Sequence, residues 1–125
     1  MADLKFLVVD DSVTMRRILV NSLNKQGYED IIEASDGKDA LAKLYSEPGI
    51  NFIITDWNMP NMDGLTFVKS IKEDSNLAGI PILMVTTRSL KEDILDAMKV
   101  GVNNYLVKPF TPQVLSDKIE AILNK

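Results

Sequence analysis

Cysteine and histidine are both absent from the 125 residues of this chain. Without cysteine, the chain forms no disulfide and offers no thiolate to a metal. Without histidine, it has no imidazole to act as a base, a nucleophile or a zinc ligand. Carboxylates, hydroxyls, lysine and backbone groups are therefore left to perform any chemistry.

Long apolar runs and an excess of basic charge are also missing. No run approaches the roughly 20 apolar residues that a membrane-spanning helix needs, and the start of the chain, Met1 to Lys5, lacks the basic and apolar regions of a signal peptide. Fourteen basic residues against eighteen acidic ones give a net charge of −4, which argues against nucleic acid as the main partner. We therefore expect a cytoplasmic protein that binds neither membrane nor nucleic acid.

Apolar runs and helical patterns alternate along the whole chain. Buried strands are predicted at 5–9, 31–34, 52–55, 82–86 and 105–107. Each is followed by a predicted helix, at 15–23 before a stop at Gly27, at 38–45, at 65–73, around 94–98 before Gly101, and at 114–123.

Five strands that are each followed by a helix imply right-handed crossovers and one parallel sheet covered on both faces. The strands are apolar without clean alternation, as expected for strands buried on both sides. The sequence shows no repeat or linker, so we expect one domain spanning 1–125 with a doubly wound α/β fold. On this pattern alone, another small doubly wound protein remains the alternative.

Charged and hydroxyl residues follow several of the predicted strands. Asp10 and Asp11 follow the first strand, Asp56 follows the third, Thr86 ends the fourth and Lys108 follows the fifth. Ligands of open α/β sheets bind at the carboxyl ends of the strands. If the first and third strands are neighbours, the three acids converge at one edge of the sheet.

Such convergence is costly without a counter-charge. Two carboxylates about 4 Å apart repel by roughly 4 kcal/mol at an effective dielectric near 20. Oxygen ligands without nitrogen or sulfur suit a hard divalent cation, and Mg²⁺ typically takes one or two carboxylates together with phosphate oxygens. Lys108 would neutralise further charge and contact a phosphate oxygen.

Each residue also has a simpler explanation. Asp10 and Asp11 could belong to a helix N-cap, Asp56 could be an ordinary turn residue, Thr86 a β-branched strand residue and Lys108 a solvated surface lysine. All these explanations would have to hold together while the residues meet at one edge. The combination therefore favours a phosphate and metal site.

Four segments carry a resemblance to a known family. Val8 to Ser12, Asp56 to Gly64, Met84 to Thr86 and Tyr105 to Phe110 resemble the receiver domain of two-component response regulators. In this family an aspartate accepts the phosphoryl group, and the matching residue here is Asp56. Because Trp57 follows Asp56 and the match covers essentially the whole chain, the sequence is most similar to stand-alone chemotaxis regulators. The resemblance implies a flavodoxin-like, five-stranded sheet with strand order 2-1-3-4-5.

The resemblance also implies roles for the residues at the strand ends. Asp56 would be the phosphoacceptor. Asp11, Asp56 and the backbone carbonyl of Asn58 would bind Mg²⁺, and Asp10 would act largely through a bound water. Lys108 would contact the phosphoryl oxygens.

Further implied roles concern the switch and its output surface. Thr86 would close on the phosphoryl group, Tyr105 would swing inward behind it, and Lys108-Pro109 would be a cis peptide. The surface that meets a flagellar motor switch protein would include Lys91, Ile94, Tyr105 and Lys118.

Asn58 and Arg88 would tune dephosphorylation. Arg88 departs from the family pattern, because well-known motor-binding members carry an acid there. The lifetime of the phosphorylated state and any dependence on an auxiliary phosphatase therefore stay open.

The expected function is that of a phosphorylation-activated chemotaxis response regulator. It would receive its phosphoryl group from a chemotaxis histidine kinase. It would catalyse only its own phosphorylation and dephosphorylation, and we expect it to be a monomer. The nearest alternative is a single-domain receiver that relays the phosphoryl group to a histidine phosphotransfer protein. An aspartate-nucleophile phosphohydrolase typically has an Asp-x-Asp motif after the first strand. A flavin-binding carrier has a glycine- and hydroxyl-rich phosphate loop at the same place. The adjacent acids Asp10 and Asp11 match neither pattern.

Overall fold

The computed structural model describes residues 3–124, in which five strands alternate with five helices. The strands are β1 (Phe6–Val9), β2 (Ile31–Ala34), β3 (Phe52–Thr55), β4 (Ile82–Thr86) and β5 (Asn104–Val107). The helices are α1 (Val13–Lys25), α2 (Gly37–Ser46), α3 (Gly64–Glu73), α4 (Lys91–Val100) and α5 (Pro112–Leu123). Every strand and helix predicted from the sequence is present.

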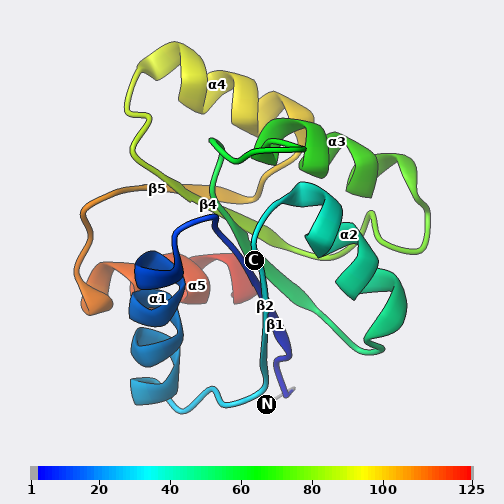
Figure 1. Ribbon diagram of the computed structural model, residues 1–125. Helices are drawn as coiled ribbons and strands as arrows, with labels where there is room; N and C mark the ends of the chain where they lie inside the picture. Colours follow the sequence, from blue (N-terminus) through cyan, green and yellow to red (C-terminus); the bar gives the residue numbers. More distant parts are fainter. Residues whose placement is uncertain (1–2, 125) are drawn as a thin grey trace.

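The strands form one parallel sheet in the order β2-β1-β3-β4-β5. Helices α1 and α5 cover one face, and α2, α3 and α4 cover the other (Figure 1). The predicted doubly wound fold and strand order are therefore confirmed. Because β1 and β3 are direct neighbours, the condition for convergence of the acids after them is met.

Both faces of the central strands are buried. In β1, Phe6 and Val8 pack into the core beneath α1 and α5, whereas Leu7 and Val9 pack into the core beneath α2, α3 and α4. All four side chains are at most 1% exposed. This double burial explains why the strand sequences lack the alternation of polar and apolar residues.

Side-chain caps define where four of the helices begin. Ser12, Asp36, Asp63 and Thr111 each accept a hydrogen bond from a backbone N–H in the first turn of the helix that follows. At the start of α1 the capping group is the Ser12 hydroxyl, which accepts from the Met15 amide at 3.1 Å. The N-cap expected within Asp10 to Ser12 is therefore Ser12, and the capping hydrogen bond uses neither Asp10 nor Asp11.

The predicted apolar faces are wider than the buried ones. Ile18 and Leu123 follow the helical spacing of their neighbours, yet they are 44% and 39% exposed. In α1 the contact with the core is made by Leu19 and Leu23, and Ile18 lies about 100° around the helix from Leu19. Within residues 3–124, no helix combines the length and apolar character needed to cross a membrane.

Candidate functional site

Three acids converge at the carboxyl ends of β1 and β3. One carboxylate oxygen from each of Asp10, Asp11 and Asp56 lies within 4.8 Å of the others. Asp10 is only 1% exposed and Asp56 is 9% exposed, whereas Asp11 lies on the surface. The cluster thus has a buried side and a side open to an incoming group.

Lys108 reaches into this cluster from the end of β5. Its amine donates to Asp10 Oδ2 at 2.8 Å and to Asp56 Oδ2 at 3.0 Å. The lysine side chain is 10% exposed, so the simpler explanation of Lys108 as an ordinary solvated surface lysine is wrong. The peptide bond between Lys108 and Pro109 is cis, as the family resemblance implied.

Burial and pairing act in opposite directions on these groups. Burial raises the pKa of Asp10, and the hydrogen bonds from Lys108 and the Ser12 amide offset this only in part. Burial alone would lower the pKa of Lys108, but the hydrogen bonds to Asp10 and Asp56 outweigh it and raise that pKa. The amine therefore stays charged between the two acids.

Backbone amides hold the remaining carboxylate oxygens. The Ser12 amide donates to Asp10 Oδ1 at 2.9 Å, and the Trp57 amide donates to Asp56 Oδ1 at 2.6 Å. With one oxygen on an amide and the other on Lys108, both carboxylates are fixed in orientation.

Gly64 makes the backbone fold tightly behind Asp56. Its amide donates to the Trp57 carbonyl at 2.7 Å. A Cβ atom at this position would collide with the carbonyl oxygen of Asp56. Only glycine therefore lets α3 begin so close to the acid.

Thr86 and Tyr105 lie at the ends of the neighbouring strands. Thr86 is fully buried, and its hydroxyl accepts from the Arg88 amide at 3.4 Å; within residues 3–124 no hydrogen bond joins it to the acids. Tyr105 is 7% exposed and donates its hydroxyl to the Arg88 carbonyl at 2.8 Å. Burial raises the pKa of Tyr105 to about 12. Tyr105 is therefore buried and held by the Arg88 backbone; its inward swing on phosphorylation stays a prediction.

Arg88 makes contacts that the sequence did not indicate. Its guanidinium donates to the side-chain oxygen of Asn58 at 3.1 and 2.9 Å and lies 4.3 Å from the centroid of the Trp57 ring. The same group pairs with Asp93 of α4 at 3.5 Å. Sequence reasoning identified Arg88 and Asn58 separately, and no spacing signal reveals that they bind each other.

The residues expected at the output surface lie on or beside α4 and α5. Lys91 is exposed, whereas Ile94 and Lys118 are half-buried and Tyr105 is buried. This part of the surface also exposes apolar side chains that the expectation did not include, namely Leu90 at 62%, Leu95 at 48% and Met98 at 43%.

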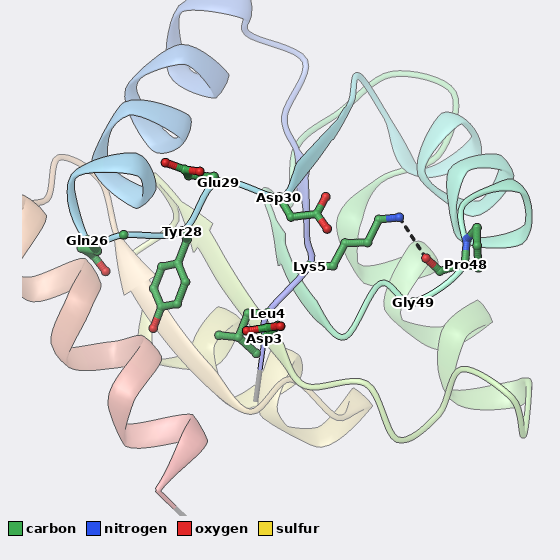
Figure 2. Close-up of a pocket in the computed structure, with 10 residues that line it drawn as sticks. Asp3, Leu4, Lys5, Gln26, Tyr28, Glu29, Asp30, Pro48 and Gly49 are labelled. Atoms are coloured by element: carbon green, nitrogen blue, oxygen red, sulfur yellow. Dashed lines mark hydrogen bonds between the residues drawn. The ribbon is translucent and has the colours of Figure 1, made fainter. Parts of the chain in front are cut away.

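A surface hollow lies at the opposite end of the sheet, where the strands begin (Figure 2). Lys5, Tyr28 and Asp30 are among its lining residues. The Lys5 amine already donates to the Pro48 carbonyl at 2.9 Å, and Tyr28 packs against Phe6 with 4.9 Å between ring centroids. Acidic and basic residues are mixed there, and none of the predicted site residues lines the hollow. The acid cluster is therefore the better candidate site.

The donor atoms of the acid cluster fit a hard divalent cation. Three carboxylates and one ammonium group leave an excess of two negative charges. Within residues 3–124, the Asn58 carbonyl accepts no hydrogen bond, so it is free to act as a ligand. Oxygen donors alone favour Mg²⁺ over softer metals.

Comparisons with known proteins agree with this geometry. Residues 6–120 match the response regulator receiver domain family. The chemotaxis protein CheY1 of Helicobacter pylori is 53% identical over 120 residues, which cover 96% of this chain and 97% of that protein.

Two solved structures share the fold. Chemotaxis protein CheY4 of Vibrio cholerae has a TM-score of 0.88 and 39% identity, covering 97% of this chain and 99% of its own. The CheX-CheY-BeF3-Mg complex from Borrelia burgdorferi has a TM-score of 0.89 and 25% identity, covering 98% of this chain and 90% of that one. The chain therefore belongs to the response regulator receiver domain family, and within it to the chemotaxis type.

Proposed function

We propose that this chain, as one receiver domain spanning 1–125, is switched on when Asp56 accepts a phosphoryl group in a Mg²⁺-dependent reaction. The observation that supports this most directly is the amine of Lys108, held at 2.8 Å from Asp10 and 3.0 Å from Asp56 beside a third carboxylate. A site with this much negative charge is suited to a divalent cation and to the phosphoryl group that the cation binds.

In the proposed step, a carboxylate oxygen of Asp56 attacks phosphorus, and the bond from phosphorus to the donor atom breaks. The donor is the imidazole of a phosphohistidine on a kinase, or the acetate of acetyl phosphate, and it leaves with the bonding electrons. Because this chain has no histidine, it cannot itself be the phosphohistidine donor. The step needs in-line positioning and charge neutralisation more than covalent help from the protein.

The residues around Asp56 divide this work. The Trp57 amide on Oδ1 fixes the plane of the Asp56 carboxylate. Lys108 would neutralise charge on the transferred phosphoryl oxygens, and Thr86 would donate its hydroxyl to one of them. Asp11, Asp56 and the Asn58 carbonyl would hold Mg²⁺, with Asp10 contributing through a water, and the bound cation would offset charge on the phosphoryl oxygens.

Exposure to acetyl phosphate and Mg²⁺ followed by intact-mass measurement tests this proposal. Wild type is expected to gain the mass of one phosphoryl group, and Asp56→Asn is expected to gain nothing. A wild-type protein that never gains this mass, or an Asp56→Asn variant that gains it equally, would contradict the proposal.

We infer that the phosphorylated form binds a flagellar motor switch protein through α4, β5 and α5, after receiving its phosphoryl group from a chemotaxis histidine kinase. The similarity to chemotaxis proteins supports this, and the complex of a relative with CheX supports a further protein partner, for which we propose an auxiliary phosphatase. Tighter binding of the phosphorylated form to a motor-switch peptide is expected. Phosphoryl transfer to a histidine phosphotransfer protein without such binding would favour the relay function instead.

A further inference from the structure

The loop between β3 and α3, residues 56–63, is tied to the start of α2. The Asn61 side-chain amide donates to Asp36 Oδ2 at 2.7 Å, and the Gly37 amide donates to the Met62 carbonyl at 3.0 Å. A Cβ atom at Gly37 would lie 2.7 Å from the Met62 side chain, so the two segments are in close contact. The end of the loop is therefore held by an element outside the phosphorylation site.

Asp36 does more here than cap a helix. Its Oδ1 accepts from the Asp39 amide at 2.8 Å, which is the capping bond, and its Oδ2 is left for Asn61. One oxygen is enough for a cap, because Ser12 caps α1 with a single hydroxyl. The second oxygen of Asp36 thus serves the loop rather than the helix.

The hydrogen bond between Asp36 and Asn61 is of the stronger kind. Asp36 is only 7% exposed, and the bonds from the Asp39 amide and from Asn61 lower its pKa, so the carboxylate stays charged. Hydrogen bonds to a charged acceptor are roughly twice as strong as neutral ones. Asn61 also holds a left-handed φ of 66°, a conformation in which asparagine is among the favoured residues.

The other end of the loop is anchored at Trp57. Gly64 donates to the Trp57 carbonyl at 2.7 Å. Between this anchor and Asn61 lie only residues 58–60, and these include Pro60, whose φ is restricted by its ring. A fixed Asn61 therefore restricts the position of the Asn58 backbone.

We propose that Asp36 is a positioning residue for the metal site: through Asn61 it fixes the backbone of Asn58, the expected carbonyl ligand, relative to Asp56. The inference rests on the proposed function, because it assumes that Mg²⁺ binds at the acid cluster. Outer-shell groups that orient metal ligands typically change metal affinity 10- to 100-fold when removed. Loss of the link between Asp36 and Asn61 should fall at the lower end, at about tenfold.

Calorimetric titration of the unphosphorylated protein with MgCl₂ tests the proposal with two variants that break the link from opposite sides. Asp36→Ser keeps a capping oxygen but is too short to reach Asn61. Asn61→Gly removes the donor and tolerates the left-handed φ. The matched control is Asp74→Ser, because Asp74 likewise accepts from one backbone amide, that of Asn76, and one side chain, Tyr45.

Asp36→Ser and Asn61→Gly should each weaken Mg²⁺ binding about tenfold, and the double variant should weaken it no further. Asp74→Ser should lose stability in urea without losing Mg²⁺ affinity. Wild-type affinity in both Asp36→Ser and Asn61→Gly, while wild type binds Mg²⁺, would overturn the positioning role and leave the proposed function standing. No Mg²⁺ binding by wild type would overturn both.

Discussion

Lys108 lies between two carboxylates, and its single charge neutralises only part of theirs. Burial raises the pKa of Asp10, and the third acid, Asp11, has a carboxylate oxygen within 4.8 Å of one on each of the other two. At the scale of single residues, the site is thus built for binding and not for stability. That conclusion can be tested without any phosphoryl donor.

We predict that Asp56→Asn makes the protein more stable when Mg²⁺ is absent. The substitution removes repulsion from two acids and loses attraction to one lysine, so a gain of about 1 kcal/mol in the free energy of unfolding is expected. Saturating Mg²⁺ should stabilise wild type by about 2.7 kcal/mol at a hundred times its dissociation constant, and the variant much less.

Urea unfolding in a chelator and in MgCl₂ measures both differences. Asp117→Asn on α5 serves as the control, since Asp117 pairs only with Gln113 among the described residues. Greater stability of wild type than of Asp56→Asn in the chelator would contradict this account of the charge balance.

Arg88→Gln is predicted to shorten the life of the phosphorylated state. The guanidinium donates two hydrogen bonds to the side-chain oxygen of Asn58 and adds positive charge beside it. Without it, the Asn58 amide is free to orient water and the phosphoryl charge is less stabilised. Loss of a contact worth about 1 kcal/mol corresponds to a rate about fivefold faster.

The rate of phosphoryl loss after donor removal tests this, with Arg17→Gln on the exposed side of α1 as the control. Trp57 emission should also change in Arg88→Gln, because the guanidinium lies 4.3 Å from the centroid of the ring. A half-life equal to that of wild type would show that Arg88 does not tune the reaction.

The residues at the strand ends could be predicted because topology alone brings them together. Once β1 and β3 are neighbours, Asp10, Asp11 and Asp56 must share one edge of the sheet. The contacts of Arg88 could not be predicted, since a long side chain reaches several partners and its rotamer depends on all of them. The hydrogen bond between Asp36 and Asn61 could not be predicted for a similar reason, because it joins two residues that are 25 positions apart in the sequence.

At the scale of elements, the predicted strands and helices are all present. The spacing of apolar residues, the capping residues and the glycines that end helices all indicate the same elements. The spacing of apolar residues does not predict how much of each helix surface is buried by neighbouring elements. Leu95 and Met98 of α4 follow a helical spacing, yet both are exposed and Ala97 is the residue buried. The width of a buried face depends on the neighbouring element, which the sequence of the helix itself does not contain.

Gly64→Ala is predicted to destabilise the junction between β3 and α3. The added Cβ would collide with the backbone at Asp56, which no side-chain rotation can relieve, so a loss of about 3 kcal/mol is expected. Gly79→Ala is the matched control, because a Cβ there meets nothing within 4 Å. Equal unfolding midpoints in urea for the two variants would show that the junction is not tight.

The cap of α2 should give the protein a pH dependence in the acid range. Hydrogen bonds lower the pKa of Asp36 in the folded state below its ordinary value of 3.8. The unfolded chain therefore binds a proton more readily, so the stabilisation is complete above about pH 4 and is lost as the pH falls through the folded-state pKa. Asp36→Asn keeps a capping oxygen but replaces a charged hydrogen-bond acceptor by a neutral one, so it should be less stable than wild type by about 1 kcal/mol at pH 7.

Urea unfolding of wild type and Asp36→Asn at pH 7 and near pH 3 checks this. The difference between the two should shrink at the lower pH. A difference that stays constant, or that grows as the pH falls, would mean that the charge of Asp36 does not stabilise the fold.

At the scale of the whole molecule, Arg88 joins the acid cluster to the proposed output surface. Its carbonyl accepts a hydrogen bond from the Tyr105 hydroxyl. Its guanidinium donates to Asn58 beside the acid cluster and pairs with Asp93 on α4. A phosphoryl group that gains one hydrogen bond from Thr86 gains roughly 1.5–3 kcal/mol. Moving a switch from 1:99 to 99:1 needs about 5.5 kcal/mol, so phosphorylation alone should not complete it.

We therefore predict that phosphorylation shifts the rotamer populations of Tyr105 only in part, and that a bound partner completes the shift. Side-chain NMR of the phosphorylated protein, with and without a motor-switch peptide, measures this. A complete shift without the peptide would show that the phosphoryl group supplies the whole switching energy.

The central claim is that Asp56 captures a phosphoryl group because its crowded neighbours hold a divalent cation. Borohydride reduction of the donor-treated protein, followed by peptide mass spectrometry, tests it most directly, because reduction converts an aspartyl phosphate to homoserine. We predict homoserine at position 56 in Mg²⁺ and unmodified Asp56 in a chelator. Homoserine at another acid, or equal modification in the chelator, would contradict the account.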